Sequence, residues 1–349
     1  MSPRKKTVSL DNGRTRPTRD QPGKATALLL RVIDMPAVFR FGICVLSSLM
    51  ISSLLYKLTA SITVDDFAHV SKSLQEPWEI VGLIAWRAVE IGLVWIMTFD
   101  SQDIWAYFIV THLPTYHILS VFYQVRPSST VLSLLILLCS IAFPLLPLHC
   151  LPAFVKNRRA SLGHPSTIAN RRILRDWLTC FYTTIAATSV FCVVQYLNLA
   201  TWMAPFMFAH FESLRTISTA QSDHTRSPNC HLFFFLTMLP VGYFLCEFLF
   251  YKPIYSPPDD PEEPANREGQ YLIVSLHRNT WGKLPAKTRA LVSRTLILTI
   301  GVVLNTIVQV LGTFDRVDFA GSFAWGGAWA MGVLVVGAMF AWIAAVDGV

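Results

Sequence analysis

The fold is decided by the stretch Ile80–Phe99, which reads IVGLIAWRAVEIGLVWIMTF. A helix needs about 20 mostly apolar residues to cross a bilayer, and this stretch is long enough. It nevertheless carries Arg87 and Glu90 one helical turn apart, well inside the apolar run. Placing an ionisable side chain at that depth costs free energy. Such a residue is therefore interpreted first as functional or as paired with another polar group. The stretch therefore predicts a membrane-spanning helix with a polar feature near its centre.

Other apolar segments along the chain have the same length and character. Hydrophobic residues make up 53% of the sequence and charged residues 15%, against roughly 25% charged residues in an ordinary soluble domain. Because backbone groups inside a bilayer must be satisfied within each segment, these segments are predicted to be helices. The sequence thus predicts an all-α, polytopic transmembrane helix bundle of about eight spans. The spans are Ala37–Tyr56, Ile80–Phe99, Ile104–Tyr123, Val131–Phe154, Trp177–Leu197, Leu232–Tyr251, Leu291–Leu311 and Phe323–Val346.

Lysine and arginine are distributed unevenly between the two sides of these spans. The N-terminal tail and the segments Lys156–Asp176 and Lys252–Arg289 hold most of the basic residues, and alternation places all three on one side. Basic loops stay in the cytosol, so both termini are predicted to be cytosolic. The net charge of +7 is then a topology signal, and the expected partner is the lipid bilayer, with no nucleic acid.

The domain organisation follows from composition. Residues 1–36 are polar and basic and are expected to form a disordered cytosolic tail, followed by a single transmembrane domain at 37–349. The run Pro257–Pro264 (PPDDPEEP) is expected to be a mobile linker. The segment Leu199–Ile217 is almost apolar enough to be a ninth span. Pro205 interrupts it, and a ninth span would invert the charge pattern, so we expect an interfacial or re-entrant helix on the outer side.

Three intramembrane charged residues are the candidate catalytic residues. Arg87 and Glu90 share a helix face and can touch, either as substrate-binding and proton-transfer groups or as a structural ion pair. A desolvated carboxylic acid that keeps its proton can act as a general acid, and Glu90 is the first candidate. A paired Arg87 would favour the carboxylate instead. Glu247, near the cytosolic end of its span, would then be the better acid, although it can also reach the headgroups.

Other polar residues in the spans have simpler interpretations. His112 and His117 flank Pro114, and a hydrogen bond across the bundle is the ordinary role for one of them. Asn305 and Gln309 share a face and are expected to join helices. The histidines and seven cysteines show no metal-ligand spacing, so neither a metal nor a cofactor is expected.

The overall plan resembles the integral membrane proteins of fungal terpenoid and meroterpenoid clusters, especially indole-diterpene clusters of the paxilline and aflatrem type. The resemblance is carried by chain length, span layout and stretches such as Phe208–Ser218 (FAHFESLRTIS). It implies a role at the endoplasmic reticulum in secondary metabolism, with an apolar prenylated small molecule as substrate and other membrane-bound pathway enzymes as partners. Related cyclases of such pathways protonate an epoxide or alkene with a membrane carboxylic acid.

A second stretch, Ser275–Gly282 (SLHRNTWG), resembles a motif of wax-synthase-type membrane acyltransferases. Those proteins have a Trp-His pair close by, whereas Lys283, Leu284 and Pro285 follow here. Our leading hypothesis is therefore acid-initiated, metal-independent cyclisation of a prenylated substrate by Glu90, with Arg87 or Glu247 as further candidates. Acyl transfer, transport and a non-catalytic scaffold for pathway enzymes stay open as alternatives.

Overall fold

The computed structural model describes residues 36–68, 70–73, 76–97, 99, 101–150, 167–168, 176–211, 228–250, 254–255 and 284–346. The chain divides into the unit Met1–Arg40, of which residues 36–40 are described, and the unit Phe41–Val349, to which the contacts below belong. The expected disordered tail, the linker Pro257–Pro264 and the stretch Ser275–Gly282 lie outside the described residues.

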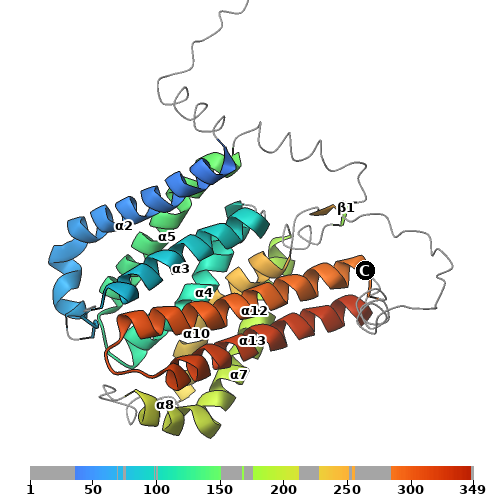
Figure 1. Ribbon diagram of the computed structural model, residues 1–349. Coiled ribbons are helices and arrows are strands. Elements are labelled where there is room, and N and C mark those ends of the chain that lie inside the picture. The colour runs from blue at the N-terminus through green and yellow to red at the C-terminus, as the bar shows by residue number, and fades with distance from the viewer. Residues whose placement is uncertain are drawn as a thin grey trace, which may run out of the picture. The chain divides into compact units, whose positions relative to one another are not determined.

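The predicted all-α class is confirmed, and long helices make up nearly all of the described chain (Figure 1). They are α2 (Ala37–Phe67), α3 (Pro77–Met97), α4 (Ser101–Val121), α5 (Pro127–Cys150), α7 (Trp177–Asn198), α10 (Pro228–Leu249), α12 (Ala286–Thr313) and α13 (Phe319–Val346). The two strands, β1 (Thr167–Ile168) and β2 (Ile254–Tyr255), have two residues each and pair antiparallel.

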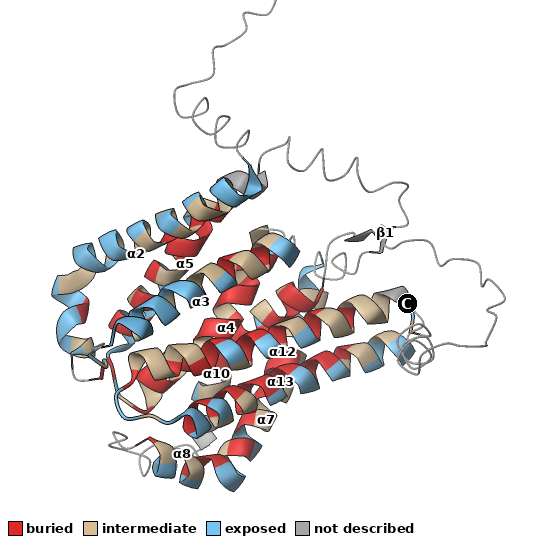
Figure 2. Ribbon diagram, in the orientation of Figure 1, coloured by how far each residue is buried: buried red, intermediate tan, exposed pale blue. Residues whose placement is uncertain are grey.

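Seven described helices, not eight, are long and apolar enough to cross a membrane. The exception is α4, which replaces the predicted span Ile104–Tyr123: it has 21 residues but is more polar. Its neighbours explain the difference, because α4 packs against α5, α10, α12 and α13 and buries residues on several faces. A helix enclosed by protein can carry polar side chains that a lipid-facing helix cannot. Figure 2 shows the contrast with α2, whose surface is largely exposed.

The expected end of the fifth span at Leu197 is wrong, because the helix continues to His210. A π-helical turn, Leu199–Met203, connects α7 to α8 (Ala204–His210). Pro205 follows closely on this π-helical turn, where the altered hydrogen-bond spacing can accommodate a residue that has no N–H to donate. No separate span begins at Leu199 among the described residues; the remainder of the expected segment, residues 212–217, lies outside them.

Glycines on α13 let it lie close to its neighbours. A Cβ at Gly326 would stand 3.2 Å from Thr306 Cβ and 3.3 Å from Val303 Cα on α12. At Gly332 it would overlap the ring of Phe191 on α7, and at Gly337 it would overlap Thr295. In a membrane, where lipid competes with any apolar surface, close approach through small residues is a main source of helix association.

Contacts between the ends of helices agree with the predicted alternation. Ser71 forms an isolated bridge with Phe314, and Phe211 forms one with Val317, and all four belong to segments predicted to lie on the outer side. The strands β1 and β2 join the two segments predicted to lie in the cytosol. The two isolated bridges place Ser71 and Phe211 at the same side only if α4 crosses the bundle together with α3, α5 and α7.

Candidate functional site

The predicted contact between Arg87 and Glu90 is present on α3. Arg87 Nη1 lies 3.3 Å from Glu90 Oε2, and the side chains are 11% and 5% exposed. The three-residue spacing puts both side chains on one face, as expected from the sequence. The pair is therefore buried among helices, so each charge needs further partners.

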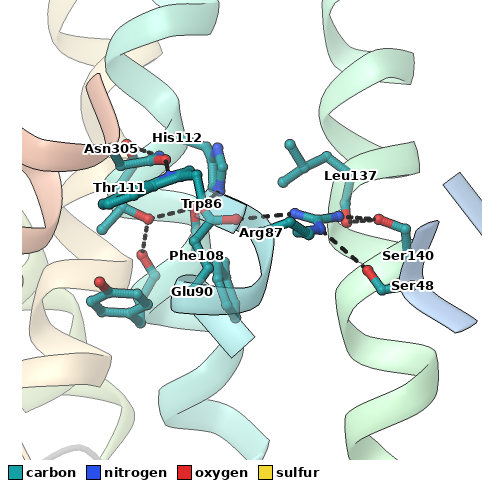
Figure 3. Close-up of polar contacts among 11 residues, drawn as sticks. Ser48, Trp86, Arg87, Glu90, Phe108, Thr111, His112, Leu137, Ser140 and Asn305 are labelled. Atoms are coloured by element: carbon teal, nitrogen blue, oxygen red, sulfur yellow. Dashed lines mark hydrogen bonds and ion pairs between the residues drawn. The ribbon is translucent and has the colours of Figure 1, made fainter. Parts of the chain in front are cut away.

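Arg87 has further hydrogen-bond partners on two other helices. Its Nε donates a hydrogen bond to Ser48 Oγ on α2, at 3.2 Å, and its Nη2 donates to Ser140 Oγ on α5, at 2.5 Å (Figure 3). Ser140 in turn donates to the carbonyl of Leu137, at 2.7 Å. A guanidinium has several N–H donors in a planar arrangement, which suits a position between three helices.

Glu90 is contacted from its other side by a histidine of α4. His112 Nε2 lies 3.0 Å from Glu90 Oε1, and His112 is fully buried. Neither ring nitrogen of His112 has a hydrogen-bond partner among the described residues, so the approach to Glu90 is a close electrostatic contact. His112 therefore reaches across to α3, but by an electrostatic contact in place of the expected hydrogen bond.

A hydrogen-bonded link extends this cluster to α12. Trp86 Nε1 donates to Asn305 Oδ1 at 3.0 Å, and Asn305 Nδ2 donates to the carbonyl of Thr111 on α4 at 2.9 Å. The prediction that Asn305 joins helices is confirmed. We call the whole set the Arg87 hub; it consists of Ser48, Trp86, Arg87, Glu90, Thr111, His112, Ser140 and Asn305.

Hydroxyl groups continue from the hub along α2 and α5. Tyr56 Oη and Ser133 Oγ lie 2.8 Å apart, and Ser129 Oγ donates to Asp66 Oδ2 nearer the end of α2. The contacts follow one face of each helix in antiparallel order, since Ser48 and Ser140 belong to the same series through Arg87. This seam holds α2, which buries only Cys44, Ser48 and Thr63.

A second buried ion pair lies apart from the hub and was missed by the sequence analysis. Arg294 of α12 binds Asp103 of α4 and also donates to the carbonyl of Phe248, at 2.6 Å. The predicted spans began at Ile104 and Leu291, which put Asp103 in a turn and Arg294 at the edge of a span. The available signal was that Arg294 is the one basic residue within the predicted span Leu291–Leu311, where a charge needs a buried partner.

The remaining candidate, Glu247, occupies the last turn of α10 and is half-buried. Tyr243 Oη donates a hydrogen bond to its Oε1 at 3.4 Å. The hub as defined has no residue from α10, so the structure does not unite the three candidates in one site. Near the other end of the helices, His210 of α8 contacts Asp318 at 2.7 Å.

The chemistry available to the hub follows from these contacts. The Glu90 carboxylate is held by the Arg87 guanidinium and faces the His112 imidazole, so both of its oxygens contact protein groups. Within the part of the chain that the structure describes, no cluster of three or more histidine, cysteine, aspartate or glutamate side chains could hold a metal ion. The arrangement is well suited to joining α2, α3, α4, α5 and α12 through polar contacts.

Comparison with known proteins gives one family similarity. Residues 176–308 match the family described as Bouquet formation protein 3 C-terminal domain. The matched region is less than half of the chain and includes Glu247, Arg294 and Asn305 but neither Arg87 nor Glu90. No curated protein and no solved structure matches the chain. The similarity does not bear on the predicted terpenoid pathway.

Proposed function

We propose that this protein is a non-catalytic integral membrane anchor of the nuclear envelope, where its bundle provides a rigid support for partner proteins. Both termini would face the cytosol or nucleoplasm, as the distribution of basic residues predicts. The endoplasmic reticulum expected from the sequence is continuous with the outer nuclear membrane, so the two locations are compatible. The non-catalytic part of the proposal rests on the buried charges.

The proposal rests on the pairing of the buried charged side chains with other groups of the protein. Glu90 contacts Arg87 and His112, and Asp103 contacts Arg294, so these buried charges are engaged by other protein groups. An acid that starts a cyclisation must be protonated and must face its substrate. Charges that hold helices together have neither requirement. The pairing therefore favours the scaffold alternative over the enzyme.

The family similarity supports the proposed location. Its description refers to bouquet formation, and the meiotic bouquet is an arrangement at the nuclear envelope. Cyclisation of a prenylated substrate by Glu90 or Glu247 stays a prediction, as does acyl transfer. Neither has support from the contacts around the candidate residues.

The first test is localisation in the organism that carries the gene. A fluorescent fusion of the full chain, expressed from its own promoter, should give a continuous rim around the nucleus. Concentration in the plasma membrane, the vacuole or the peripheral reticulum without a nuclear rim would contradict the proposal.

A deletion strain then separates the anchor from the enzyme. Deletion should reduce bouquet formation in meiosis and leave the profile of prenylated metabolites unchanged. Accumulation of a prenylated intermediate in the deletion strain, restored to parental levels by the wild-type gene but not by Glu90→Gln, would overturn the anchor proposal and support cyclisation.

A further inference from the structure

Two buried polar side chains on α4 have no hydrogen-bond partner among the described residues. They are His112, through its Nδ1, and Thr115, through its Oγ1; the residues are 0% and 4% exposed. They stand three residues apart, so they lie on adjacent parts of the same side of the helix. Buried polar atoms without a partner are rare in folded proteins, and each one needs a physical explanation.

Thr115 departs from the pattern of three other buried threonines in this protein, as does the buried Thr306. Thr111, Thr188 and Thr295 each donate their hydroxyl to the carbonyl four residues earlier, at 2.7–2.9 Å. The carbonyl in that position for Thr115 is that of Thr111, and it already accepts the hydrogen bond from Asn305 Nδ2 at 2.9 Å. The hydroxyl of Thr115 is therefore available to a group outside the backbone of its own helix.

Neither ring nitrogen of His112 forms a hydrogen bond among the described residues, and Nδ1 also has no charged group beside it that would take that place. Its Nε2 lies 3.0 Å from Glu90 Oε1, and a carboxylate at that distance favours the tautomer with the proton on Nε2. Nδ1 is then an acceptor when the ring is neutral and a donor when the ring is charged. Its partner must be able to act in both roles. A water molecule can do so, and it can also serve a hydroxyl at the same time.

We propose that one water molecule is bound inside the bundle and bridges His112 Nδ1 and Thr115 Oγ1. Side chains three residues apart are neighbours on one helix face, and a water molecule with hydrogen bonds of about 2.8 Å can join two such groups. Buried waters typically satisfy such polar groups. The water extends the Arg87 hub to Thr115 and fixes the orientation in which His112 faces Glu90. This inference stands independently of the anchor function.

The first experiment compares thermal unfolding of the full chain in lipid nanodiscs. Thr115→Val removes the hydroxyl at nearly constant volume, and loss of a bridging water should lower Tm by about 2–4 °C. Thr115→Ser keeps the hydroxyl and should lie closer to wild type. Thr111→Val is the matched control one turn away, because its hydroxyl bonds within its own helix. A Thr115→Val variant with a raised Tm would overturn the proposal, since replacing an unpartnered buried hydroxyl by a methyl group is stabilising.

The second experiment detects the water itself. Infrared spectra of the wild-type protein recorded in D₂O and in D₂¹⁸O should differ by a narrow O–D stretching band from buried water. The band should persist in Thr111→Val and Thr115→Ser and be lost in Thr115→Val. An unchanged band in Thr115→Val, or its absence from the wild-type protein, would show that no water is bound between these side chains.

Discussion

Arg294 binds both carboxylate oxygens of Asp103, with Nη1–Oδ1 at 3.2 Å and Nη2–Oδ2 at 2.8 Å, although 191 positions separate the two residues. The rings of Phe99 and Phe248 lie 5.8 and 5.2 Å from the guanidinium carbon and complete its surroundings. Arg294 lies within the region that matches the bouquet family, whereas Asp103 lies outside it. The matched region of this chain therefore depends on α4 to neutralise its buried charge.

This ion pair should be needed for folding. Arg294→Met leaves Asp103 buried without its cation, and we expect the free energy of unfolding to fall by about 3–5 kcal/mol. The measurement is unfolding of the purified protein together with its abundance in the membrane. Asp103→Leu combined with Arg294→Met should recover most of the loss, because no unpaired charge remains.

Arg316→Met is the control for that prediction. Arg316 pairs with Asp315 at 3.7 Å, and their side chains are 71% and 63% exposed. Exposed ion pairs contribute about 0–1 kcal/mol, so the variant should match wild type. A double Asp103→Leu, Arg294→Met variant no better than the single one would show that the guanidinium is needed for its contacts to α10 instead.

Two adjacent glycines of α13 should respond oppositely to alanine. Gly326→Ala would push a methyl group against the α12 backbone, 3.3 Å from Val303 Cα, and should lower the free energy of unfolding by about 1–3 kcal/mol. Gly327→Ala has nothing within 4 Å and should raise it by about 0.5–1 kcal/mol through reduced backbone freedom. Equal effects of both variants on unfolding would mean that α12 and α13 are further apart than described.

Two adjacent serines of α2 provide a similar comparison for the hub. Ser48→Ala removes the acceptor of Arg87 Nε and should lower the free energy of unfolding by about 1–3 kcal/mol. Ser47 donates to the carbonyl of Cys44 within α2, so Ser47→Ala should cost less than about 0.5 kcal/mol. Thermal unfolding in nanodiscs measures both. An unchanged free energy of unfolding for Ser48→Ala would show that the packing of α2 does not depend on the Arg87 hub.

Glu90→Gln distinguishes the anchor from the cyclase. The amide keeps the size of the side chain and can still hydrogen-bond to Arg87, but it cannot act as an acid. If the protein is an anchor, the variant should restore bouquet formation in the deletion strain in proportion to its abundance. Loss of an acid–base group in an enzyme would instead lower turnover by about a hundredfold or more at unchanged abundance.

We expect the turn between α12 and α13 to face the lumen and the start of α12 to face the cytosol. A single cysteine at Arg316, in the turn between α12 and α13, should be labelled only from the luminal side in a background without other reactive cysteines. Lys287→Cys, near the start of α12, should be labelled only from the cytosolic side. Luminal labelling of Lys287→Cys would reverse the assignment of the basic segments and make the charge-based topology wrong.

The helices could be predicted from the sequence because the bilayer imposes a local requirement. Each segment must satisfy its own backbone groups, so length and apolar content are enough to locate a span such as Ile80–Phe99. The contact between Arg87 and Glu90 was also local, because three residues on one helix fix it. The continuation of the helix beyond Asn198 was missed because a π-helical turn, Leu199–Met203, precedes Pro205 and leads into α8.

Only the tertiary structure decided what the buried charges do. The sequence determined that Arg87 and Glu90 share a face, but Ser48, His112 and Ser140 reach them from three other helices whose packing no local pattern encodes. The same holds for Asp103 and Arg294, each of which looked like the edge of a span when taken alone. Span formation depends on the free energy of each segment in lipid, whereas pairing depends on which helices become neighbours, and that is settled by close packing over the whole bundle.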